Sequence, residues 1–274
     1  MLIGNKEFDV ANNCYIMGIL NITPDSFSDG GNFNSLDTAL KHVEQMLKDG
    51  ADIIDVGGES TRPNYIKISD EEEITRIVPV IEAIKKNFDI PVSLDTYKYK
   101  VAESGIKAGA DLINDIWGLQ YDNGEMAKLI AKHNLPCCLM HNRKNTNYHC
   151  FINDILQDMQ NIIATAQKAE IKKNKIILDV GVGFAKSYEN NLEIIKKLDI
   201  FKNTLGYPIL LGTSRKSVIG LTLDLPVDER LEGTLATTVI GVMKGVSFVR
   251  VHDIKENARA IKMTQAIMKG YSHG

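Results

Sequence analysis

The sequence has little of several features that mark particular classes of protein. Its formal charge is only −3 at pH 7, from 32 Lys and Arg against 35 Asp and Glu, so no basic field suggests nucleic acid as a partner. It contains neither an apolar run of about 18 residues nor a leading segment that passes from charged to apolar. We therefore expect a cytoplasmic protein that is neither secreted nor inserted into a membrane.

Cysteines are also few. The chain has four, Cys14, Cys137, Cys138 and Cys150, and none of them forms a C-x-x-C pair. Cys137 and Cys138 are adjacent within an apolar run, where both cannot join one ordinary disulfide framework. We interpret all four as reduced thiols, which agrees with a cytosolic location.

A glycine-rich turn for binding a dinucleotide is missing as well. A doubly wound open sheet usually carries G-x-G-x-x-G directly after its first strand. The stretch DVGVGFAK at 179–186 has G-x-G without the third glycine, and it follows a late apolar run. Because this match is weak, the open sheet is only the alternative fold.

What the sequence does contain is an alternation of short apolar runs with amphipathic segments. Near-continuous apolar runs are typical of parallel strands buried on both faces, and eight of them suffice for a (β/α)8 barrel of about 250 residues. We predict an α/β fold of this kind, a TIM barrel that forms a single domain over residues 1–274, with a short hairpin in the first dozen residues. The runs lie at 15–21, 52–57, 92–95, 112–115, 137–141, 176–179, 209–212 and 247–252.

The segments between the runs carry signals for helix ends. We expect the first helix to start at an N-cap on Ser35 and to stop at Gly50. Ser69 and Glu72 have the spacing of a capping box for the next helix. The apolar faces of these segments indicate packing against the strands.

Polar side chains gather where the apolar runs end. In a barrel all strand C-termini meet at one face, which is where active sites lie. Taken singly, each of these residues also suits a helix cap or a turn, but their accumulation favours a site in the barrel mouth. They are Asn21, Asp55, Asp95, Asn114, Asp115, His141, Asp179, Arg250 and His252.

The mouth also has a basic sector. The stretch GTSRKSVIG at 212–220 follows the seventh run and places Arg215 and Lys216 where a helix starts, and the eighth run adds Arg250 and His252. Such a combination favours an anion over a merely solvated pair of cations. Carboxylates and amides on the other side suit a heterocycle rich in N–H groups. The pattern therefore indicates a nitrogen heterocycle joined to a phosphorylated leaving group.

Seven motifs, which occur in the same order over nearly the whole chain, resemble those of the dihydropteroate synthases. The first of them, together with ESTRP and SRKS, is highly specific. The motifs are GILNITPDSFSDGG (18–31), DVGGESTRP (55–63), SLDT (93–96), INDI (113–116), LDVGVGF (178–184), LLGTSRKS (210–217) and RVHD (250–253).

The resemblance implies a reaction. A (β/α)8 barrel, usually a homodimer, would condense 6-hydroxymethyl-7,8-dihydropterin diphosphate with 4-aminobenzoate and would give 7,8-dihydropteroate and pyrophosphate in folate biosynthesis. It implies Mg2+ as the metal, bound by Asn21, and a dissociative substitution through a pterin cation. The loops 22–34 and 58–68 would close over that cation and exclude water.

The resemblance also implies roles for particular residues. Lys216, Asp95 and Arg62 would be catalytic. The pterin diphosphate would be bound by Thr61, Arg62, Asp95, Asn114, Asp179, Lys216, Arg250 and His252. The pocket for 4-aminobenzoate would be formed by Phe27, Thr61, Pro63, Phe184, Lys216 and Ser217.

The chain departs from the family pattern at two places. Val180 stands where the family has proline, and the residues after Pro63 read NYIKIS instead of small residues. Two other functions remain possible on the same fold. A pterin-dependent methyltransferase would not need SRKS or RVH, and a non-catalytic pterin-binding module would not need Asn21, Arg62 or Lys216 together.

Overall fold

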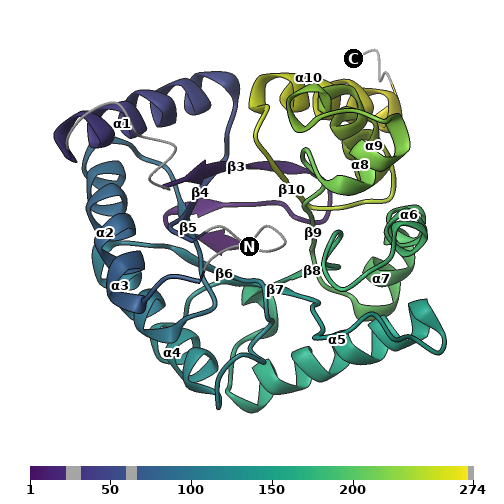
Figure 1. Ribbon diagram of the computed structural model, residues 1–274, viewed down its shortest axis with the longest axis horizontal. Coiled ribbons are helices and arrows are strands. Elements are labelled where there is room, and N and C mark those ends of the chain that lie inside the picture. Colours follow the sequence, from purple (N-terminus) through teal and green to yellow (C-terminus); the bar gives the residue numbers. More distant parts are fainter. Residues whose placement is uncertain (23–31, 60–66, 271–274) are drawn as a thin grey trace.

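A closed barrel of eight parallel strands forms the centre of the computed structural model (Figure 1). The structure describes residues 1–22, 32–59 and 67–270, with the side chains of 32–35 left out. The strands follow each other around the barrel in chain order, and the last one closes it by pairing with the first, as where Phe248 lies opposite Tyr15. The strands are β3 (Tyr15–Asn21), β4 (Ile53–Gly57), β5 (Val92–Asp95), β6 (Leu112–Asp115), β7 (Cys137–Met140), β8 (Ile176–Asp179), β9 (Ile209–Leu211) and β10 (Phe248–Val251).

Helices surround the barrel, as Figure 1 shows. The predicted (β/α)8 fold is therefore confirmed, and the eight predicted runs match the strands to within a residue at each end. None of the helices in the described ranges is long and apolar enough to cross a membrane. The helices are α1 (Asn32–Asp49), α2 (Asp70–Asn87), α3 (Tyr99–Ala108), α4 (Glu125–His133), α5 (Phe151–Lys168), α6 (Tyr188–Lys196), α7 (Leu198–Leu205), α8 (Ser217–Leu223), α9 (Leu231–Met243) and α10 (Ile254–Lys269).

The helix ends follow the local signals with one exception. The Ser69 hydroxyl accepts a hydrogen bond of 3.1 Å from the backbone N–H of Glu72 and so caps α2 as predicted. Gly50 follows α1 with φ = +103°, a conformation that glycine adopts without strain. Ser35, however, is not the cap of α1, because the helix already begins at Asn32. The apolar spacing marks where the buried face begins, and a helix can start before that point.

The lower part of the barrel interior is apolar and closed. A predicted hairpin, β1 (Leu2–Ile3) and β2 (Lys6–Glu7), is present. Its Ile3 and the following Phe8 pack in one buried cluster with side chains from the strands. The polar residues predicted for the site lie towards the opposite, C-terminal end of the strands. The strand residues of this cluster are Met17, Ile53, Leu112, Cys138, Ile177, Leu210 and Phe248.

All four cysteines lie in the described part of the chain, and all are free thiols. Cys14, Cys137 and Cys138 are buried, whereas Cys150 is exposed. This agrees with the prediction that all four are reduced thiols.

Candidate active site

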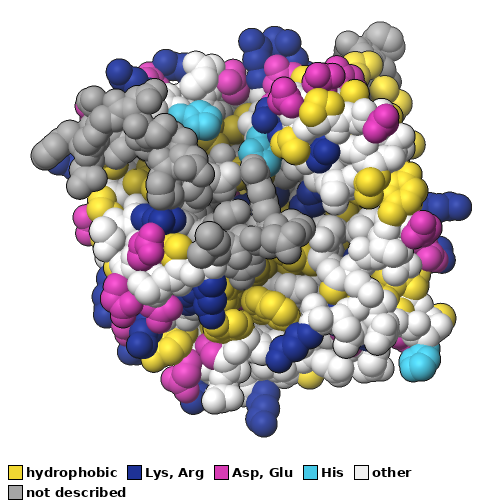
Figure 2. Space-filling model, viewed as in Figure 1, with side chains coloured by type: hydrophobic (Ala, Val, Ile, Leu, Met, Phe, Trp, Pro, Cys, Tyr) yellow, Lys and Arg dark blue, Asp and Glu magenta, His cyan; other side chains and the backbone are white. Residues whose placement is uncertain are grey.

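The polar ends of four strands converge above the apolar interior. Asp55 on β4, Asp95 on β5, Asn114 on β6 and Asp179 on β8 are all buried there, with exposed fractions of 0–8%. Figure 2 shows lysine and arginine side chains together with a histidine near the centre of the face onto which Figure 1 looks. The mouth thus combines buried acids with cations, as the sequence predicted.

Arg250 on β10 occupies the acidic side of the mouth. Its Nε donates to Asp55 Oδ2 at 2.6 Å, and one of its terminal nitrogens donates to Asp95 Oδ2 at 2.6 Å. Asn114 Nδ2 lies 3.5 Å from both carboxylate oxygens of Asp55. Burial opposes the charge of Arg250, but Asp55 and Asp95 more than compensate and raise its pKa. We call Asp55, Asp95, Asn114 and Arg250 the acidic sector.

Asp95 has one carboxylate oxygen to spare. Its Oδ1 is buried and has no hydrogen-bond partner among the described residues. Burial raises the pKa of Asp95 to about 7, although the Arg250 charge lowers it in part. A buried acceptor without a partner is costly, so this oxygen is ready to accept an N–H from a ligand.

On the other side of the mouth, backbone groups hold the charged side chains. Asp179 Oδ1 accepts the backbone N–H of Gly181 at 2.7 Å. Lys216 Nζ donates to the carbonyl of Val182 at 2.5 Å and lies 4.8 Å from the centre of the Phe184 ring. Burial lowers the pKa of Lys216 to about 8, and the Asp179 charge opposes that shift. We call Asp179, Lys216 and the loop 180–186 the lysine sector.

Two glycines keep the mouth open. A Cβ on Gly212 would lie 3.7 Å from Asp179 Oδ2, 3.8 Å from Lys216 Nζ and 3.9 Å from Arg250 Cβ. A Cβ on Gly57, at the end of β4, would lie within 3.9 Å of the side chains of Asp95 and Asn21. The space that a ligand needs between these groups is therefore present because neither strand end carries a side chain there.

An apolar wall stands beside the lysine sector. Phe184 and Trp117 pack against a small cluster of Tyr97, Ile116 and Met140 that is separate from the main core. The sequence analysis identified only Phe184 from this wall. The others come from strand ends and following turns, and in the sequence they look like ordinary core residues.

Several residues expected at the mouth have other partners. The Asp115 carboxylate accepts the backbone N–H groups of Trp117 and Leu119, so it stabilises a turn, as its alternative interpretation held. Arg215 forms an ion pair with Asp253 and is not part of the basic sector. The sequence missed this because the pairing joins the loops after two different strands.

His252 and Ser217 lie near the basic side. His252 Nδ1 is 2.9 Å from the Ser214 hydroxyl, which also accepts the backbone N–H of His252. Ser217 is the exposed first residue of α8. Val180, at the expected departure from the family pattern, is fully buried in the core, and Asp179 Oδ1 accepts the backbone N–H of Gly181 across it.

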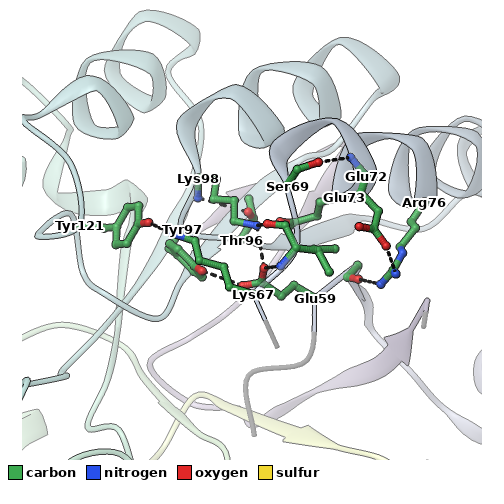
Figure 3. A network of polar contacts seen from close by, with 12 residues as sticks. Glu59, Lys67, Ser69, Glu72, Glu73, Arg76, Thr96, Tyr97, Lys98 and Tyr121 are labelled. Carbon is green, nitrogen blue, oxygen red and sulfur yellow. Dashed lines mark hydrogen bonds and ion pairs between the residues drawn. The ribbon is translucent and has the colours of Figure 1, made fainter. Parts of the chain in front are cut away.

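A second network, buried around Lys98, adjoins the acidic sector, since the charge of Glu73 acts on Asp95. Figure 3 shows this network. Lys98 Nζ is bound between two carboxylates, Glu59 Oε2 at 2.7 Å and Glu73 Oε2 at 2.8 Å. Glu59 also accepts the Tyr97 hydroxyl at 2.6 Å and the backbone N–H of Ile68 at 2.9 Å. Lys98 further donates to the Ile68 carbonyl at 2.8 Å. This network fixes both Glu59 and Ile68, and the sequence analysis did not identify it.

Four of the predicted site residues lie outside the described residues: Phe27, Thr61, Arg62 and Pro63. The same holds for most of the two loops expected to close the site.

Asn21 is the one residue that the sequence assigned to a metal. It ends β3, and its Oδ1 would be 3.9 Å from a Cβ on Gly57, on the same side of the mouth as Asp95 Oδ2. No group of three His, Cys, Asp or Glu within the described ranges has the geometry of a metal site. The amide oxygen of Asn21 belongs to the oxygen ligands that Mg2+ takes, and this ion usually keeps several waters and binds substrate phosphates as well.

Comparison with known proteins identifies the family. A family model described as pterin binding enzyme matches residues 17–252. The dihydropteroate synthase of Clostridium beijerinckii is 63% identical over 270 residues, which make up 98% of this chain and 100% of that protein.

Two solved structures agree. The crystal structure of the dihydropteroate synthase of Clostridium difficile in the presence of pteroic acid is 51% identical, with a TM-score of 0.93 over 96% of this chain and 100% of its own. The enzyme of Xanthomonas albilineans, solved with 4-aminobenzoic acid, is 34% identical, with a TM-score of 0.89 over 95% of each chain.

The barrel carries acidic side chains and lysines at its mouth, and the family model matches most of its length. These two findings define the class of the protein: the chain belongs to the pterin binding enzyme family. Within that family it groups with the dihydropteroate synthases, which are transferases.

Proposed function

We propose that this site condenses 6-hydroxymethyl-7,8-dihydropterin diphosphate with 4-aminobenzoate to give 7,8-dihydropteroate and pyrophosphate. The observation that carries the proposal is the division of the mouth into buried acceptors on one side and a lysine against an aromatic ring on the other. The first side suits the N–H-rich edge of a pterin, and the second suits an aromatic carboxylate beside a charged leaving group.

The pterin edge is expected to bind Asp95, Asn114 and Asp179. The unpartnered Oδ1 of Asp95 supports this role, because a pterin N–H would supply the missing donor. Arg250 now binds Asp95 Oδ2, and its aliphatic stem lies next to Gly212. A ring bound at the acceptors would therefore lie against Arg250, with Lys216 at its edge.

The diphosphate is expected to bind Arg62, Arg250 and His252. Asn21, whose Oδ1 lies near Asp95 at Gly57, would bind the diphosphate by way of Mg2+. Bound there, the ion would neutralise charge that develops on the departing diphosphate oxygens. The cations of this chain would stabilise the same charge from the other side.

The pocket for 4-aminobenzoate is expected at Phe184, Lys216 and Ser217, with Phe27, Thr61 and Pro63. Phe184 offers a ring face in the apolar wall, and Lys216 lies over that ring. An arylamine held there would present its nitrogen to the pterin, while its carboxylate would meet the start of α8.

The reaction needs no strong base. The C–O bond to diphosphate breaks first, and its electron pair leaves with the diphosphate. The pterin methylene cation then takes the electron pair of the arylamine nitrogen, which loses a proton to the solvent. The residues of the chain thus bind and orient the two substrates and exclude water from them. Acidic groups on the pterin side stabilise the positive ring.

The direct test is to incubate the purified protein with the pterin diphosphate, Mg2+ and 4-aminobenzoate. We expect pyrophosphate and dihydropteroate in equal amounts. The proposal would be overturned if pyrophosphate were released at the same rate without 4-aminobenzoate, or if no product formed at all. A matched reaction with Asp95→Asn protein controls for contaminating synthase from the expression host.

We also infer that residues 1–274 act as one domain, in the cytoplasm, and as a homodimer. Large apolar side chains on the neighbouring helices α8, α9 and α10 are exposed, among them Leu221 (67%), Met243 (62%) and Ile267 (69%). A second copy of the chain is the expected occupant of this surface. Light scattering on the purified protein tests it, and a monomer mass at micromolar concentration would contradict it.

A further inference from the structure

Lys186 lies at the end of the loop that follows β8, and the mechanism described above does not use it. Its Nζ lies 2.9 Å from the carbonyl oxygen of Gly181, 2.9 Å from that of Phe184 and 3.0 Å from His141 Nδ1. Gly181 is bound to Asp179, and Phe184 belongs to the apolar wall. The ammonium therefore touches both ends of the segment that joins two proposed substrate-binding side chains.

The third contact continues to a second helix. His141 is completely buried, and its Nε2 lies 2.9 Å from Asp158 Oδ2 on α5. Asp158 also accepts Arg143 Nε at 2.5 Å. Burial alone would raise the pKa of Asp158, but the hydrogen bonds from His141 and Arg143 lower it to about 2. Asp158 is thus an ionised acceptor at the far end of the chain of contacts.

The state of His141 follows from its neighbours. Burial lowers the pKa of His141 to about 4, so the ring is neutral at pH 7. Because Asp158 only accepts, Nε2 carries the hydrogen, and Nδ1 must accept. Lys186 therefore faces three acceptors, and only the ammonium form has three hydrogens to donate to them.

The backbone of this loop is tightly packed, and other side chains also contact it: Asn191 Oδ1 accepts the N–H of Gly183 at 2.6 Å, and the Tyr148 hydroxyl donates to the carbonyl of Ala185 at 2.9 Å. Gly181 has φ = +69°, and a Cβ there would lie 2.0 Å from the carbonyl oxygen of His141. The remaining inner carbonyl, that of Val182, accepts Lys216 from the mouth side. Two lysines thus hold three carbonyls of one tight loop, Lys216 from inside the site and Lys186 from behind it.

We propose that Lys186, connected through His141 to Asp158, is a positioning residue of the synthase site. It sets the loop 180–186 so that Asp179 meets the pterin and Phe184 meets 4-aminobenzoate at the same time. The proposal rests on the proposed function for the identity of the two ligands.

Charged groups from every neighbouring element act on Lys186. Burial lowers its pKa to about 7, Asp179 on β8 raises it, Lys216 before α8 and Arg143 after β7 lower it, and Asp158 on α5 raises it. An ammonium so close to losing its proton depends on its three acceptors, which agrees with a role in holding them.

The experiment compares Lys186→Met with Lys197→Met. Methionine keeps the stem and removes the donors, and Lys197 forms only a surface ion pair with Glu193 at the end of α6. We expect Lys186→Met to raise the KM for 4-aminobenzoate and the Kd for the pterin each by roughly 10-fold, the loss of a charged hydrogen bond. The kcat at saturation should change less. Lys197→Met should match the wild type.

A second measurement does not depend on the substrates. Hydrogen exchange of the ligand-free protein should be faster in the peptide covering 179–187 in Lys186→Met, and unchanged in Lys197→Met. If Lys186→Met does not fold, Asp158→Asn takes its place, with the same changes at roughly 3-fold, because it removes the negative charge at the far end and leaves a weaker acceptor there.

The outcomes separate this inference from the proposed function. Absence of product with wild-type protein defeats the proposed function, while the exchange result still tests the loop. The positioning role is overturned if Lys186→Met lowers only the melting temperature and leaves KM and Kd unchanged. It is also overturned if kcat alone falls with unchanged exchange, since that indicates a direct chemical role.

Discussion

The two sides of the barrel mouth hold their cations in different ways. Around the acidic sector, Arg250 lies between Asp55 and Asp95, and Lys98 in the adjoining network lies between Glu59 and Glu73. In the lysine sector, Lys216 and Lys186 donate to backbone carbonyls. Removing a cation from the first side leaves buried carboxylates unpaired, which costs stability. Removing one from the second side leaves mainly neutral acceptors without a donor, the loop carbonyls and, for Lys186, also His141 Nδ1, which loosens a loop and costs function.

The largest effect on stability is expected when a cation that lies between two buried carboxylates is removed. Lys98→Met leaves Glu59 and Glu73 facing each other without a counter-charge, so we expect about 3–5 kcal/mol less free energy of unfolding. Urea denaturation measures it. Lys107→Met, which removes an exposed ion pair with Glu103, is the matched control and should change stability little. If Lys98→Met lowers the free energy of unfolding no more than Lys107→Met does, the proposed difference between the two sides of the mouth is wrong.

Lys216→Met makes the opposite prediction for the lysine sector. We expect turnover to fall about 100-fold, because the cation expected between the pterin and the aminobenzoate carboxylate is lost, while the melting temperature stays close to that of the wild type. Lys173→Met is the control, since Lys173 also lies over an aromatic ring, that of Tyr207 at 5.2 Å, away from the mouth. A large fall in melting temperature with turnover retained would place Lys216 in the fold and not in the site.

The stability of the folded chain should also depend on pH through His141, which contacts Lys186 of the lysine sector. The pKa of His141 is about 4 in the folded chain, against the ordinary value of 6.5 that it has in the unfolded chain. The unfolded chain therefore binds more protons between these two pH values. The contribution is complete above pH 6.5 and is lost as the pH falls towards 4. We expect about 2 kcal/mol less stability at pH 5 than at pH 7 from this group. His141→Gln should lose less between the two pH values in paired urea melts, and an equal loss would refute the assignment.

Asp95→Asn tests the acidic sector by ligand binding. The substitution keeps the shape but replaces one acceptor oxygen by a donor and removes the negative charge that pairs with Arg250, so pterin affinity should fall roughly 10- to 100-fold. Calorimetry with a pterin measures it. Asp115→Asn is the comparison, because Asp115 binds only backbone N–H groups of its own turn. If both variants bind pterin equally well, Asp95 is not at the pterin edge.

The smallest effects are expected from adding one methyl group to either side of the mouth, near the acidic sector or near the lysine sector. Gly57→Ala places a methyl near Asn21 and Asp95, and Gly212→Ala places one near Asp179 and Lys216, both at ordinary contact distances. We expect Gly57→Ala to raise the Mg2+ concentration for half-maximal activity a few-fold, and Gly212→Ala to leave it unchanged while weakening pterin binding a few-fold. Equal Mg2+ requirements in both variants would remove Asn21 from the metal site.

Local patterns were enough to predict the frame of the molecule. The spacing of apolar runs identified the eight strands, and the polar residues at their ends identified Asp55, Asp95, Asn114 and Asp179 as neighbours in the mouth. Period and strand direction carry this information, because in a closed parallel barrel every strand end must reach the same face. The cap at Ser69 was equally local.

Only the tertiary structure decided which charges pair. Arg250 meets Asp55 across 195 residues of sequence, Arg215 turns to Asp253 instead of the mouth, and His141 connects Lys186 to a helix. A side chain at a strand end has several possible partners, and its sequence neighbours do not select among them. The choice depends on distances between strands that exist only once the barrel is closed. For that reason the sequence alone determined the barrel, the family motifs and the composition of the mouth, while closure determined which cations bind carboxylates and which hold the backbone.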